Sequence, residues 1–121
     1  MTQEEKDLLL QDLCGRLPYG VKISVNDNIE SLQGINALDN VAEYGSFLSC
    51  DIDEVKPYLF PMSSMTDEQR KIYHELIGGI FETSALINFE VLEDFFHKNH
   101  LDWRGLVPKG LAIDATGLNI Y

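Results

Sequence analysis

The sequence is short of positive charge. Nine Lys and Arg residues stand against twenty Asp and Glu residues, which gives a formal net charge of -11 at pH 7 and an isoelectric point near 4.4. The acids are spread along the whole chain rather than gathered in a tail. Because the resulting field repels phosphate backbones and anionic lipids, direct nucleic-acid binding is disfavoured.

Cysteine and long apolar runs are scarce as well. The two cysteines are Cys14, on the apolar side of a predicted helix, and Cys50, at the end of a predicted strand. We expect both to be small, buried and reduced side chains, although spacing alone leaves a disulfide open. The first residues are polar and acidic, and no apolar run approaches the length of a membrane span, so we expect a cytoplasmic protein with no membrane segment.

The usual signatures of nucleotide binding and catalysis are missing too. The chain has no GxGxxG, no GxxxxGK and no GxSxG. Asp51, Asp53 and Glu54 resemble the start of a calcium loop. That loop needs glycine at its sixth position and glutamate at its twelfth, where this chain has Lys56 and Met62. We therefore expect no cofactor and no enzymatic activity.

What the chain does contain is typical of a folded protein. Of its 121 residues, 45% are hydrophobic and 24% are charged, and twelve are aromatic. This length fits one domain over residues 1–121 and leaves little room for a second core.

Three helices are predicted from capping and periodicity. Capping boxes, Thr2 with Glu5 and Thr66 with Gln69, open the first two helices. The first is predicted from Thr2 to Arg16, and the second ends at Gly78 and Gly79. Asn88 is predicted to cap the third, whose buried stripe would be Phe89, Leu92, Phe95 and Phe96, with Glu90, Glu93, Asp94 and His97 facing away.

Strands are predicted where apolar and polar residues alternate. This pattern covers 21–25, 29–35 and 41–50, the last with a bulge or bend at Gly45. Pro57 and Pro61 predict an extended crossover over 55–65, and short strands are expected over 80–87 and 111–113. The predicted fold class is α+β, with a small antiparallel sheet of three or more strands flanked by three helices.

One cluster has the residue types of a metal site. Glu93 and His97 lie four apart and so share a helix face, and His100 follows just past the helix end. No second His pair and no CxxC accompanies them. A solvated helix face is therefore the favoured interpretation, and we expect no bound metal.

Aromatic and arginine residues outside the helices are candidate partner contacts. Tyr58, Trp103 and Arg104 are of the types that dominate binding interfaces. The same residues also suit a core role, in which large side chains seal the open end of a small sheet. We expect Phe60 to be such a core side chain, and Tyr58 or Trp103 to be exposed.

Three blocks of the chain resemble a known family. They read MTQEEKDLLLQDLCGRLPYGVK, EVKPYLFPMSSMT and LDWRGLVPKGLAIDA. Their order and spacing are similar to those of short uncharacterised proteins that recur in Bacteroidetes genomes, often among prophage and mobile-element genes. The blocks cover somewhat under half of the chain. The resemblance implies a cytoplasmic accessory protein of bacterial or phage origin, and it brings no catalytic residue.

The leading functional hypothesis is a non-enzymatic protein-interaction module that binds an unidentified protein. The alternatives are an acidic DNA mimic that inhibits a nucleic-acid-binding protein, and a small-ligand or metal-binding enzyme. An interaction module should expose an apolar patch, whereas a mimic should array carboxylates at near-phosphate spacing. An enzyme would need a pocket that holds His97, His100 or a cysteine. The oligomeric state stays open.

Overall fold

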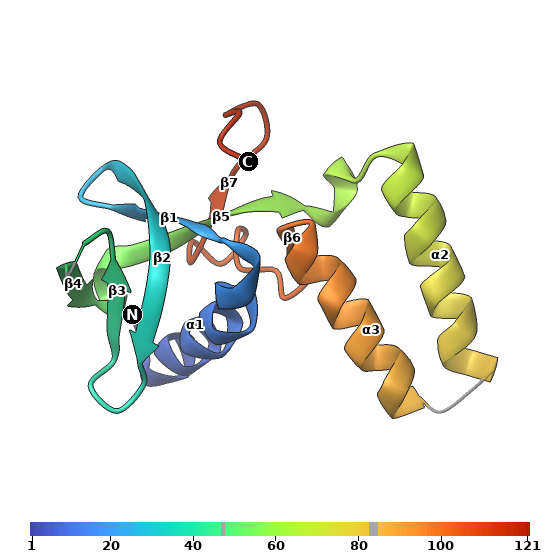
Figure 1. The fold of residues 1–121 in the computed structure, drawn as a ribbon, viewed down its shortest axis with the longest axis horizontal. Helices are drawn as coiled ribbons and strands as arrows, with labels where there is room; N and C mark the ends of the chain where they lie inside the picture. Colours follow the sequence, from blue (N-terminus) through green and yellow to red (C-terminus); the bar gives the residue numbers. More distant parts are fainter. Residues whose placement is uncertain (47, 83–84) are drawn as a thin grey trace.

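The computed structural model describes residues 1–46, 48–82 and 85–121, and for residues 79–82 and 85–88 it describes the backbone alone. It has an α+β fold, which confirms the predicted class (Figure 1). The helices are α1 (Gln3–Arg16), α2 (Asp67–Glu82) and α3 (Ala85–Lys98). The strands are β1 (Lys22–Val25), β2 (Asn28–Asn36), β3 (Val41–Tyr44), β4 (Leu48–Asp51), β5 (Val55–Pro61), β6 (Leu101–Asp102) and β7 (Ile113–Asp114).

Helix α1 begins as its capping chemistry predicts. The Thr2 hydroxyl accepts from the Glu5 N–H at 3.1 Å, and the Glu5 carboxylate accepts from the Thr2 N–H at 2.9 Å. Leu9, Leu10 and Leu13 of this helix are buried in the main core against residues of β1, β2 and β5. The residue at position 14 does not share that face. Cys14 is exposed, contrary to expectation, because the buried stripe continues through Asp12 and Arg16 instead.

The sheet is larger than predicted, and it is mixed. Its order is β4-β3-β2-β1-β5-β6, with β7 also paired to β5. Strands β1 to β4 form the predicted antiparallel meander. The predicted strand over 41–50 is instead two strands, because Gly45 adopts a φ of 56° and turns the chain back. Phe47 lies outside the described residues.

The segment predicted as a crossover is a central strand. β5 runs antiparallel to β1 and parallel to both β6 and β7. Burial of Val55, Tyr58 and Leu59 holds it inside the sheet although Pro57 lacks a backbone donor. The last strand, β7, starts at Ile113, so it overlaps the predicted strand over 111–113 only at its end.

The region around the two adjacent glycines is helical, so the strand predicted over 80–87 is wrong. α2 continues through Gly78 to Glu82, and α3 starts at Ala85, before the predicted Asn88 cap. Residues 83–84 lie outside the description. Gly78 has no positive φ, and a glycine costs only about 1 kcal/mol inside a helix, which does not by itself end it.

The helical hairpin of α2 and α3 leaves the sheet on the side opposite β4 (Figure 1). It begins after β5 and ends at β6, and these two strands pair with each other. A second apolar cluster lies at its base, with Leu92, Phe95, Phe96 and Leu101 buried. Within the described ranges, no helix combines the length and apolar character needed to cross a membrane.

Candidate functional site

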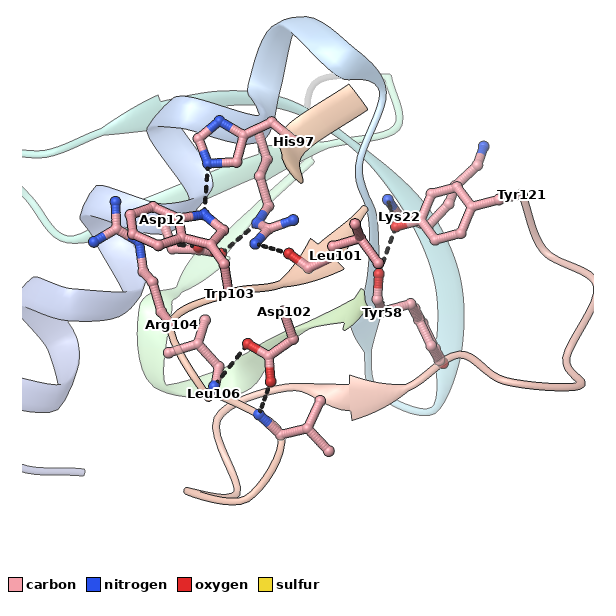
Figure 2. Close-up of polar contacts among 12 residues, drawn as sticks. Asp12, Lys22, Tyr58, His97, Leu101, Asp102, Trp103, Arg104, Leu106 and Tyr121 are labelled. Atoms are coloured by element: carbon pink, nitrogen blue, oxygen red, sulfur yellow. Dashed lines mark hydrogen bonds and ion pairs between the residues drawn. The ribbon is translucent and has the colours of Figure 1, made fainter. Parts of the chain in front are cut away.

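The three residues considered as metal ligands, Glu93, His97 and His100, are not brought together as a metal site in the described part of the chain. His97 is only 6% exposed rather than facing solvent, because its Nε2 accepts from the Trp103 indole N–H at 3.1 Å (Figure 2). The His100 ring instead stacks on Tyr121 with centroids 3.7 Å apart. Among the described residues, no group of three or more His, Cys, Asp and Glu side chains could hold a metal ion.

Both histidines are held in their neutral form at pH 7. Burial, together with the positive charge of Arg16, lowers the pKa of His97. The same two causes lower the pKa of His100 to about 4. The His97 imidazole serves as a hydrogen-bond acceptor. The His100 ring packs on Tyr121, and its buried Nδ1 has no hydrogen-bond partner among the described residues.

Tyr58 is not an exposed contact. It is 7% exposed, and its strand is paired with β7 at this position, with Ile113 opposite Tyr58. Its backbone carbonyl accepts from the Tyr121 hydroxyl at 2.7 Å, and that hydroxyl accepts from the Lys22 N–H at 2.9 Å (Figure 2). Phe60 is half-buried against the second apolar cluster, so it is less deeply buried than the core role predicts.

Trp103 and Arg104 are half-buried and act in a structural network. The Trp103 ring stacks on Phe96, with centroids 5.6 Å apart. The Arg104 guanidinium lies 4.2 Å from the Trp103 ring centroid, and its Nε donates to the Asp12 carboxylate at 3.2 Å. These contacts join α1, α3 and the segment after β6.

The centre of that network is a fully buried ion pair. Arg16 Nε donates to Asp12 Oδ2 at 2.7 Å, and Arg16 Nη2 donates to the Leu101 carbonyl at 2.6 Å. Asp102 nearby accepts from the Leu106 and Val107 N–H groups at 2.7 and 2.9 Å (Figure 2). None of Asp12, Arg16 and Asp102 was a candidate from the sequence. The available signal was an Asp and an Arg four apart on the apolar stripe of α1.

A groove between α2 and α3 is the candidate binding site. Its volume is about 650 Å³, and its apolar lining consists of Ile72, Leu76, Val91 and Phe95. Ile72 and Val91 are 40% and 45% exposed. None of the described side chains of α2, residues 67–78, is fully buried. Apolar side chains thus line a surface that no other part of the described chain covers.

The base of the groove is held by polar contacts. The Gln69 side-chain amide donates to Asn99 at 3.2 Å and links α2 to the end of α3. The Tyr19 hydroxyl donates to Asp94 at 2.6 Å, and this hydrogen bond raises the pKa of Tyr19. Tyr73 packs on Phe96 with ring centroids 5.9 Å apart. The Gln69 and Tyr73 contacts link the two walls, and the Tyr19 contact links α3 to the turn after α1.

This groove was not predicted from the sequence. The second helix was predicted from its capping box, and the predicted stripe of the third helix did not include Val91. Phe89, predicted in that stripe, is exposed. The pattern identifies an apolar face of a helix, but it does not tell whether the rest of the chain covers that face.

A second pocket, of about 450 Å³, lies between α1 and α3. His97 lines it together with Glu90, Glu93, Asp94 and Arg104. The Nε2 of His97 is engaged by Trp103, and no Ser, Thr or Cys is among the described lining residues. Among the described lining residues, the pocket therefore holds no hydroxyl or thiol nucleophile beside a free imidazole.

Comparison of the chain with protein-family models, curated proteins and solved structures found no match.

Proposed function

We propose that this protein is a non-enzymatic interaction module that binds another protein through the groove between α2 and α3. The observation that carries the proposal is the uncovered apolar lining of that groove, in which Ile72 and Val91 stand exposed. A surface helix normally buries its apolar stripe. Contiguous exposed apolar surface is a mark of protein-binding sites.

The energetics support an interface centred on these residues. A fully buried Val or Ile side chain contributes about 1.5–3 kcal/mol relative to an exposed one. Because Ile72 and Val91 are a little under half exposed, covering each would contribute about 1 kcal/mol. Phe95 and Leu76 form the floor of the groove, which a partner side chain would contact without any rearrangement of the two helices.

The pocket beside His97 supports an enzyme less well. Its imidazole Nε2 accepts from Trp103, and burial lowers the pKa of His97. A general base needs a free lone pair within reach of the proton that it abstracts. The resemblance of the three sequence blocks supports a cytoplasmic accessory role, of bacterial or phage origin, for the interaction module.

The proposal is tested by affinity capture from the native cell with matched variants. Val91→Asp places a charge in the groove, and Leu38→Asp places the same charge on a side chain that is 96% exposed in the turn between β2 and β3. We expect a protein that the wild type and Leu38→Asp retain and that Val91→Asp loses. Capture that is indifferent to Val91→Asp would contradict the proposed function.

Salt separates this function from DNA mimicry. An interface with an apolar centre keeps most of its affinity at high ionic strength even where charges on its rim add to binding, whereas binding through an array of carboxylates alone weakens steeply as salt rises. We therefore expect the captured protein to stay bound in about 0.5 M salt. Release at moderate salt of a protein that binds nucleic acid would favour the mimic.

A further inference from the structure

We propose that the natural occupant of the groove between α2 and α3 is an amphipathic helix flanked by basic residues, supplied by a partner protein. This inference rests on the proposed function and names the partner's chemistry. Two independent features of the groove carry it, namely the backbone of its walls and the charge of its rim.

The walls of the groove favour a helix over an extended strand. Both walls are α-helices, whose interior backbone N–H and C=O groups are already paired within the helix. An extended occupant would find no free backbone partners there, and burying its own unpaired groups would cost free energy. A helix satisfies its backbone internally and needs only side-chain contacts, as in the helix-in-groove mode of recognition.

The lining residues follow helical spacing on both walls. Gln69, Ile72 and Leu76 follow one another along α2, and Val91, Phe95 and Lys98 do so along α3. Each stripe spans seven residue steps or about 10 Å, two turns of a helix. Apolar anchors at i, i+4 and i+7 of an occupant helix therefore match the length of the groove.

The rim of the groove favours a basic occupant. Glu68 and Asp94 line it, with Lys98 as the cation beside them. The hairpin sequence from Asp67 to Lys98 holds seven Asp and Glu against three Lys and Arg. A cationic flank would be attracted to this surface and would gain in association rate. A second copy of the chain would bring one acidic groove against another, with net charge -11 on each chain.

Fluorescence anisotropy with synthetic peptides and the full chain tests this inference. The probe is a labelled helical peptide of about 16 residues, with leucines at i, i+4 and i+7 and lysines on its flanks. One control peptide keeps the composition but spreads the leucines around the helix. The other replaces every lysine with glutamate.

We expect the basic amphipathic peptide to bind with a Kd on the order of 10 µM. Both controls should bind at least about tenfold more weakly, and Val91→Asp should weaken the basic peptide by a similar factor. Leu38→Asp should change nothing. Glu68→Lys should weaken the basic peptide and strengthen the glutamate peptide, because it reverses a charge on the rim.

Each contrary outcome has a separate meaning. Equal binding of the redistributed peptide, or indifference to Val91→Asp, means non-specific attraction and overturns the inference. Groove-dependent capture of a partner that presents no helix overturns it and leaves the proposed function standing. A Val91-dependent dimer in sedimentation equilibrium makes the occupant a second copy and overturns it too. Absence of both capture and peptide binding overturns both proposals.

Discussion

Replacing Asp12 with Asn tests whether the buried charges hold α1 against the segment after β6. The Asp12 carboxylate accepts from Arg16 at 2.7 Å and from Arg104 at 3.2 Å, and both Asp12 and Arg16 are fully buried. The Asn side chain has nearly the same shape, so the change removes charge without opening a cavity. Breaking a buried pair and leaving its partner charged costs about 3–5 kcal/mol.

That cost is a large share of the stability of a small domain, which is about 5–15 kcal/mol. For a chain of 121 residues, about 4 °C in Tm corresponds to 1 kcal/mol, so we expect Asp12→Asn to lower Tm by about 12–20 °C. Thermal and urea melts followed by circular dichroism measure the loss. Asp7→Asn, an exposed Asp of the same helix, is the control and should stay within about 0.5 kcal/mol.

The double variant Asp12→Leu with Arg16→Met tests what happens when both charges of the pair are removed together and apolar side chains fill their place. Removing both charges leaves no fully buried guanidinium without a carboxylate, and Arg104, which also loses Asp12, is partly exposed. The double variant should therefore be more stable than Asp12→Asn. A fall in Tm of less than about 2 °C for Asp12→Asn would refute the reasoning, since Arg16 would then be stabilised by other means than this carboxylate.

Two further predictions concern His100 and Tyr121. The pKa of His100 is about 4 in the folded protein against 6.5 for an ordinary His, so the unfolded chain binds the proton first. Stability is therefore full above pH 6.5 and falls as pH drops toward 4, by about 2 kcal/mol after allowance for partial exposure. Urea melts across this range should show that the free energy of unfolding depends less on pH in His100→Asn, since Asn tolerates the φ of 55° at this position. The control His74→Asn, at an exposed position, should keep the pH dependence of the wild type. The same pH dependence in all three proteins would contradict the role of His100. Tyr121→Phe removes the hydroxyl that bridges Lys22 and Tyr58 and should cost about 1–3 kcal/mol in the same melts, whereas an unchanged midpoint would mean that water replaces the bridge.

Local chemistry predicted a good part of the fold. The Thr2 capping box and the alternation over 21–25 each depend on neighbouring residues, and each is confirmed. The failed prediction of a crossover over 55–65 depends on distant parts of the chain. β5 becomes central because β6 and β7 from the last third of the sequence pair with it, and no local pattern reports such pairing.

The site was harder to predict than the fold. A helix face is normally assigned to the core by its apolar residues, and here polar residues are buried on that face. Asp12 and Arg16 lie inside because each charge neutralises the other, while Cys14 lies outside. His97 is buried because Trp103 donates to it. The groove between α2 and α3 depends on what fails to cover Ile72 and Val91, and a helical pattern alone carries no such information.

The pairing of Phe60 with Leu101 has a consequence for how this protein can change over evolution. Two neighbouring strands lie about 4.8 Å apart. The chain therefore leaves the sheet after Pro61 and returns beside β5 at Leu101, the partner of Phe60. In topology, the helical hairpin is thus an insertion between two neighbouring strands, with its two ends close together. The length of such an insertion can change at little cost in chain entropy. The hairpin that carries the proposed binding surface can therefore be lengthened, shortened or exchanged while the strand order of the sheet stays the same.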